Sequence, residues 1–192
     1  MLAFSRLTSI LFFVLSLSFL TCALPTTPAG QTNALAARGT GDELVKICAD
    51  LEVNVKAKVD AIVAVDIKVL ADVEAKVTEL VAIVTVAAKA IATLGAKIDI
   101  DADVKAQIAA HIAVVIRLIV NLCITLVAKL GVTVLLALLA NIDVCLQLLL
   151  VNLSVVVEGI VVLVAKLLVS LTAQVFVNVH LNLCLNVLGL SS

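Results

Sequence analysis

The sequence has no tryptophan and no tyrosine, and four of its five phenylalanines lie within the first twenty residues. Aliphatic side chains therefore supply almost all of the apolar surface, in a chain that is 64% hydrophobic. Proteins that cross a bilayer usually carry Trp and Tyr at both membrane interfaces. Surfaces for nucleic acid combine clustered cations with stacking aromatic rings. Because the net charge is −1 and no basic block occurs, we predict no nucleic-acid partner.

Glycine and proline are absent from residues 42–94. Strands are about 3–10 residues long and need turns between them, so this stretch is difficult to fold as a sheet, although apolar residues alternate along 51–77. Apolar residues also recur at the spacing of one broad helical stripe. The stripe consists of Leu44, Cys48, Leu51, Val55, Val59, Ile62, Leu70, Val73, Val77, Leu80 and Val84. We predict helix here, with a kink or break near residues 66–72.

Glycines divide the rest of the chain into helix-length segments, at positions where a glycine favours a helix C-terminus. The predicted helical segments are 42–94 (one or two helices), 101–130, 132–157 and 160–188. Residues 174–187 alternate apolar and polar side chains, which leaves a strand open there. Short connections make sequence neighbours antiparallel. The predicted fold is all-α, an antiparallel bundle of four to five long helices.

The N-terminus has the pattern of a secretory signal. Arg6 supplies a positive charge, residues 10–20 form an apolar core, and small residues precede a cleavage site after Ala23. We predict a signal peptide at 1–23, with a retained anchor as the alternative, and a flexible leader at 24–41. Arg38 leaves a second processing site open. Residues 42–192 then form a single helical domain.

Charge is distributed unevenly along this domain. Residues 42–105 form a charged amphipathic half, and residues 106–192 form an apolar half that retains only five charged residues. These are Arg117, Lys129, Asp143, Glu158 and Lys166. Each apolar segment keeps one narrow polar stripe, which on 132–157 comprises Asp143, Gln147, Ser154 and Glu158. This pattern suits bundle helices better than lipid-facing spans, because an unpaired Asp near mid-span costs about 2.5–3.5 kcal/mol.

Signal cleavage removes Cys22 and leaves an even number of cysteines, which in a secreted chain favours disulfides. The candidates are Cys48, Cys123, Cys145 and Cys184. In helical hairpins no pair is in ideal register, and the smaller misfit favours Cys123–Cys145 together with Cys48–Cys184. The alternative is that these are buried free thiols acting as small hydrophobic side chains.

No motif indicates a catalytic, cofactor-binding or metal site. Asp99 begins a calcium-like spacing, but Val104 and Ala110 replace the required Gly and Glu. His111 and His180 have no partner motif for catalysis or metal binding. Asn152 lies in an N-glycosylation sequon, Asn-Leu-Ser. We therefore expect no enzymatic activity and no cofactor, with Asn152 as a glycosylation candidate.

Two functional classes remain. One is a secreted structural protein whose surplus apolar surface self-associates or coats an interface. The other is a membrane-active or integral membrane protein with the helices after Lys105 inserted in lipid. Fractionation of the producing cells separates them.

The order of signal peptide, hydrophilic half, hydrophobic half and few cysteines resembles a family of small secreted structural proteins of mushroom-forming fungi. The resemblance covers the whole chain and rests on architecture, without a sharp motif. It implies an extracellular, cell-wall location, a role in hyphal attachment and aerial growth, and partners among cell-wall material, apolar interfaces and further copies of the chain. The hydrophobins of the same fungi have eight cysteines in a fixed pattern, so this chain is not one of them.

Overall fold

A computed structural model describes residues 29–64, 70–171 and 173–190, with side chains from Gly39 onward. The signal peptide predicted at 1–23 lies outside the described residues. Contacts divide the chain into two units, 1–36 and 37–192, and the helical bundle belongs to the second. The first described helix starts at Ala29, so residues 29–41 are helical where the sequence predicts a flexible leader.

Seven helices are described, four long and three short. They are α2 (Ala29–Val63), α3 (Leu70–Thr93), α4 (Ala102–Leu130), α5 (Val132–Val156), α6 (Ile160–Leu167), α7 (Ala173–Asn178) and α8 (Asn182–Val187). No strand occurs within the described ranges. The all-α prediction is therefore confirmed. Helix α2 ends at Val63 and α3 begins at Leu70, and most of the break expected near residues 66–72 lies outside the described residues.

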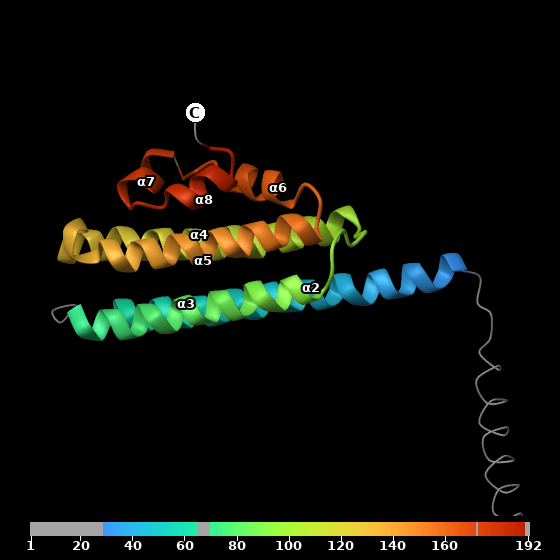
Figure 1. The fold of residues 1–192 in the computed structure, drawn as a ribbon, viewed down its shortest axis with the longest axis horizontal. Helices are drawn as coiled ribbons and strands as arrows, with labels where there is room; N and C mark the ends of the chain where they lie inside the picture. Colours follow the sequence, from blue (N-terminus) through green and yellow to red (C-terminus); the bar gives the residue numbers. More distant parts are fainter. Residues whose placement is uncertain (1–28, 65–69, 172, 191–192) are drawn as a thin grey trace, which may run out of the picture. The chain divides into compact units, whose positions relative to one another are not determined.

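Within residues 37–192, the helices stack as α2 with α3, then α4 with α5, then the short helices α6 to α8 (Figure 1). Helices α4 and α5 are joined by Gly131 alone, whose φ of 84° suits glycine, and they run antiparallel. Helices α3 and α4 follow one another in sequence but are not packed as neighbours; α3 packs closely against α5. The rule that short connections join adjacent helices thus fails at residues 94–101.

This connection is fixed by backbone hydrogen bonds to the end of α5. The amide groups of Lys97 and Ile98 donate to the carbonyl oxygens of Val155 and Val156, at 3.0 and 2.8 Å. These two bonds satisfy carbonyl groups that the last turn of a helix leaves free. They also hold the chain as it crosses from the α2/α3 layer to the start of α4.

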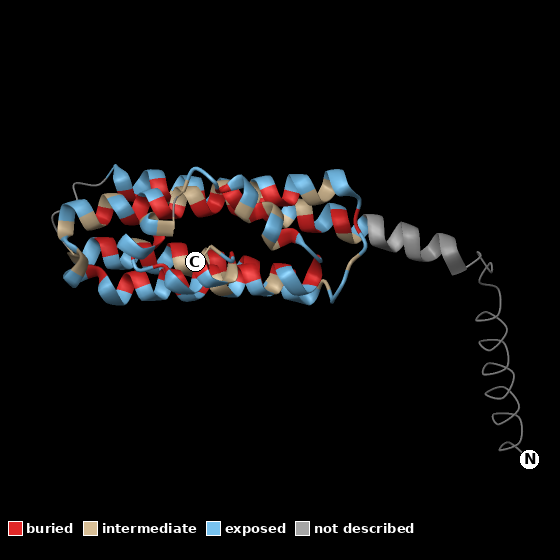
Figure 2. Cartoon of the chain, turned by 90° about the horizontal axis from the view of Figure 1, so that it is seen from above, coloured by how far each residue is buried: buried red, intermediate tan, exposed pale blue. Residues whose placement is uncertain are grey.

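The predicted helical stripe of residues 44–84 forms the core of the α2/α3 layer. All of its members are buried except Leu70, which is partly buried. Buried residues line the inner sides of both rows of helices, and exposed residues follow the outer edges (Figure 2). The described residues of this Val-rich segment therefore form helices, as the helical spacing predicts, although apolar and polar residues also alternate along it.

The single helix predicted for residues 160–188 is wrong. The chain there forms three short helices, and His180, at φ 57°, breaks the helical path between α7 and α8. Its alternating sequence places apolar residues on several sides of any continuous helix. The breaks allow Phe176, Leu181 and Leu185 all to be buried. This burial explains why the chain forms three short helices there instead of one continuous helix.

Candidate functional surface

Large apolar side chains that face solvent are concentrated in the apolar half. Among the described residues, those before position 106 are Val53, Val63 and Val86. Those after it are Ile124, Val134, Leu136, Val144, Leu148, Val151, Val155, Val162, Leu167, Val169, Val177 and Leu183. We call this second set the apolar surface. Its members come from α4 to α8, and exposed patches of this kind mark sites of association.

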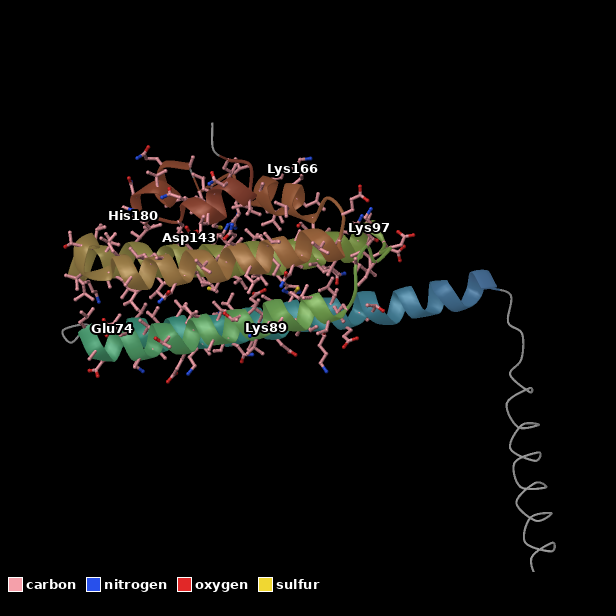
Figure 3. The ribbon with its side chains drawn as sticks, viewed as in Figure 1. Glu74, Lys89, Lys97, Asp143, Lys166 and His180 are labelled. Atoms are coloured by element: carbon pink, nitrogen blue, oxygen red, sulfur yellow. The ribbon has the colours of Figure 1, made fainter. Side chains whose placement is uncertain are left out.

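The α2/α3 layer has the opposite character. Exposed charged residues such as Glu74 and Lys89 project from α3 (Figure 3). Lys58 of α2 and Glu79 of α3 form an ion pair at 2.6 Å, and Lys58 lowers the pKa of Glu79 by hydrogen bonding and by its charge. The outer side of this layer is therefore hydrated, whereas the outer sides of α5 and α6 are largely aliphatic.

An open groove of about 410 Å³ runs between α2 and α3. Its lining is mainly aliphatic and includes Leu51, Ile83 and Val86, with Asp50 and Asn54 as polar members. It holds no grouping of nucleophile and base. Across the described parts of the chain, no three His, Cys, Asp or Glu side chains are grouped so as to hold a metal ion.

The polar stripe predicted for α5 is wrong at Asp143. This side chain is only 4% exposed, and Figure 3 places it between α5 and the short helices. Its Oδ2 accepts the backbone N–H of Leu183 and its Oδ1 that of Cys184, each at 2.8 Å. The carboxylate is buried because it supplies acceptors to the first turn of α8, whose amide groups have no intrahelical partner.

The four candidate cysteines are free and buried, and none is at disulfide distance from another. The predicted pairs Cys123–Cys145 and Cys48–Cys184 are therefore absent from the structure. For the second pair the reason is topological: Cys48 lies in α2 and Cys184 in α8, with the α4/α5 layer between them (Figure 1). The alternative reading, buried thiols packed as small hydrophobic groups, matches the structure.

Burial also controls the chemistry of these thiols. Desolvation raises the pKa of Cys48, Cys123, Cys145 and Cys184 from 9.0 to about 12 in each case. Neighbouring Asp143 contributes to the raised pKa of the last three. Since the thiolate is the reactive form, the folded chain keeps its cysteines unreactive near neutral pH.

Two further polar residues, Asn152 and His111, take part in contacts between helices. The side-chain amide of Asn152 donates to the carbonyl oxygen of Ala88 at 2.8 Å, so a glycan on this nitrogen requires that bond to break. His111 Nδ1 lies 2.7 Å from Glu52 Oε2, which links α4 to α2. His180 is exposed in the turn before α8. Asp101 occupies the N-cap of α4 without a side-chain capping bond.

Sequence reasoning missed the capping role of Asp143. The available signal was that it is the only charged residue inside a 25-residue apolar helix, a position that demands a partner if buried. The backbone amides that serve as this partner belong to a segment about forty residues later in the chain. The sequence around Asp143 therefore does not identify them.

The chain matches no protein-family model and no curated protein sequence. Its functional assignment therefore rests on the surface chemistry described above.

Proposed function

We propose that this chain is a secreted, non-enzymatic structural protein of the cell wall or extracellular matrix, which self-associates and coats apolar interfaces. The observation that carries the proposal is the division of the exposed surface. Exposed charged side chains are frequent on α2 and α3, and exposed aliphatic side chains are frequent on α5 and α6. A protein with one hydrated and one aliphatic side lowers its free energy by placing the aliphatic side against air, wall polymer or another apolar surface.

Tensiometry tests this function. The full chain, expressed with its own N-terminus and purified from the medium, is expected to lower the surface tension of water. Val162→Ser combined with Val169→Ser removes aliphatic groups from the apolar surface and should weaken the effect. Val53→Ser combined with Val86→Ser, at similarly exposed positions in the charged layer, is the matched control and should not. An unchanged surface tension with the wild-type chain removes the proposal.

The second candidate is insertion into lipid. Helices α4 and α5 are long and apolar enough to cross a membrane by length and composition, and half of the apolar window in each is buried against other helices. Fractionation of producing cells discriminates between the two functions. The structural function predicts protein in the medium or in wall extracts. Recovery in a membrane pellet that resists alkaline extraction favours insertion and contradicts the coating function.

A further inference from the structure

The outward face of α5 carries a heptad seam that has no partner among the residues that the structure describes. Counting along the helix, seven of its exposed residues follow alternating steps of three and four. They are Val134, Ala137, Asn141, Val144, Leu148, Val151 and Val155. The Val and Leu members are between 36% and 54% exposed. This is the spacing of the a and d positions through which helices pair in coiled coils, and we call these seven residues the α5 seam.

The solvent-facing positions of the neighbouring helices have a different composition. On α3 they include Thr78, Glu79 and Lys89 beside Val86, and on α4 they include Asn121 and Lys129 beside Ile124. A solvent-facing helical stripe is ordinarily polar in this way. The exposed side of α5 therefore carries more large aliphatic side chains than the exposed sides of α3 and α4.

We propose that the α5 seam is occupied by the α5 seam of a second copy of this chain, in a parallel, in-register dimer. The inference rests on the self-association in the proposed function and names the surface that performs it. Charge permits this pairing, because α5 presents no exposed charged side chain. Its single acidic residue, Asp143, is buried. Two copies thus approach without repulsion and without desolvating a charge.

The residues beside the seam extend the surface that a partner can cover. Ala140 is exposed and Gln147 is partly exposed on the same helix. A specific protein interface buries at least about 1,200 Å² in total, so a dimer has to cover these residues together with the seam. The flanking positions carry no opposite charges that would fix the orientation of the partner helix.

Asn141 supplies the orientation instead. It is the only polar member of the seam, and a single Asn at an a position selects the register in which it meets another Asn. Parallel, in-register pairing brings Asn141 opposite its counterpart and keeps all seven seam residues in contact. An antiparallel arrangement centred on Asn141 leaves Val151 and Val155 beyond the end of the partner helix, so it buries less aliphatic surface.

Sedimentation velocity on the full chain at micromolar concentration tests the dimer. Val144→Glu combined with Leu148→Glu should raise the dimer dissociation constant by at least about 100-fold, because like charges then meet across the seam. Ala71→Glu combined with Ala75→Glu places the same charges at the same spacing on the exposed side of α3 and should leave the dimer intact. A monomeric wild-type chain, or equal effects of the two double variants, overturns the proposal.

A cross-linking experiment tests the orientation. Val144→Cys lies at a d position, where parallel in-register helices bring the two copies within disulfide reach. Mild air oxidation should therefore cross-link this variant into a covalent dimer, while Val53→Cys, exposed on α2, should not cross-link. Absence of the Val144→Cys dimer overturns the parallel register, and this variant retains an uncharged side chain, so folding is preserved.

Two further measurements separate this inference from the proposed function and from lipid binding. A wild-type chain that stays monomeric but lowers surface tension overturns the α5 seam and leaves the coating function standing. A dimer that is abolished by the Glu pair and yet has no effect on surface tension supports the seam and removes the coating function. Flotation of a monomeric wild-type chain with phosphatidylcholine vesicles, lost in the Glu pair, overturns the second copy as occupant in favour of lipid.

Discussion

Asp143 of α5 caps the helix that begins forty residues later: its Oδ1 accepts the backbone N–H of Cys184 at 2.8 Å. Its second oxygen accepts the neighbouring N–H of Leu183 at the same distance. Both bonds are charge-assisted and shielded from water, which makes them stronger than neutral hydrogen bonds. One polar side chain of the apolar α5 thereby binds the C-terminal segment through two hydrogen bonds.

Replacing this carboxylate should destabilise the fold. Asp143→Ala leaves the two amide groups unpaired, and we expect the free energy of unfolding to fall by about 3 kcal/mol. Asp143→Asn should lose less, because its amide oxygen still accepts one bond. Urea unfolding measures the loss, and hydrogen exchange should show faster exchange at Leu183 and Cys184. Ser154→Ala, an exposed site on the same helix, is the control, with an effect within about 0.5 kcal/mol. Unchanged protection of both amides would contradict the capping role.

The thiols of the folded chain should be free. Alkylation with iodoacetamide in guanidinium, without reductant, is expected to modify Cys48, Cys123, Cys145 and Cys184, as counted by mass spectrometry. Under native conditions the same reagent should modify them very slowly, because burial raises the pKa of each thiol to about 12. If the denatured, unreduced chain takes up no label at these positions, two disulfides are present and the free-thiol arrangement is wrong.

The same raised pKa predicts alkaline instability. Cys48 has a pKa of about 12 in the folded chain against 9.0 as its ordinary value. Below pH 9 the thiol is protonated in both the folded and the unfolded chain, so its ionisation does not change the free energy of unfolding. Above pH 9 the unfolded state loses the proton first, so stability falls as pH rises toward the folded pKa. By pH 11 this single thiol lowers the free energy of unfolding by about 2–3 kcal/mol.

Urea unfolding of Cys48→Ala across this pH range isolates the effect. The stability advantage of the wild-type chain over Cys48→Ala should shrink by that amount between pH 8 and pH 11. Val55→Ala, a buried position on the same helix without a thiol, should show a difference that does not change with pH. A constant difference for both variants would show that Cys48 ionises as readily in the folded chain as in the unfolded one.

The ion pair between α2 and α3 should titrate at low pH. Lys58 lowers the pKa of Glu79 below its usual 4.5, first through a side-chain hydrogen bond and then through its charge. The ion pair contributes its full stabilisation at pH values above the usual pKa of a glutamate. This stabilisation is lost as the pH falls through the lowered pKa of Glu79. Carboxyl titration by NMR should place the pKa of Glu79 higher in Lys58→Met than in the wild-type chain. Lys76→Met should move it less, and an equal shift in both variants would contradict the specific pair.

The helices of the charged half were predictable because each carries its own signal. Residues such as Leu51, Val55 and Val77 recur at helical spacing without a glycine or proline between them, and the same residues form the core. The segment after Gly159 was not predictable in this way. Its aliphatic side chains fit several periods equally well, so contact with α4 and α5 decided where its helices end.

The candidate surface was predicted only in outline. Composition showed that residues 106–192 contain more aliphatic side chains than one core requires, but it did not show which of them face solvent. The prediction placed Asp143 outward and left the opposite side of α5 for the core. In the structure Asp143 is buried, and Val144 and Leu148 are exposed. One acid in an apolar helix is compatible with either orientation until its hydrogen-bond donors are known.

The sequence by itself determined the helical class, the glycine-marked helix ends and the contrast between a charged and an apolar half, because these follow from local periodicity and composition. The tertiary structure alone decided that α3 packs on α5, that no two of the described cysteines are at disulfide distance, and that the α5 seam faces solvent. Each of these depends on which surfaces meet across the bundle, and in a chain built almost entirely from Val, Leu, Ile and Ala many pairings bury similar aliphatic area. The polar groups that must find partners, Asp143 above all, distinguish among them.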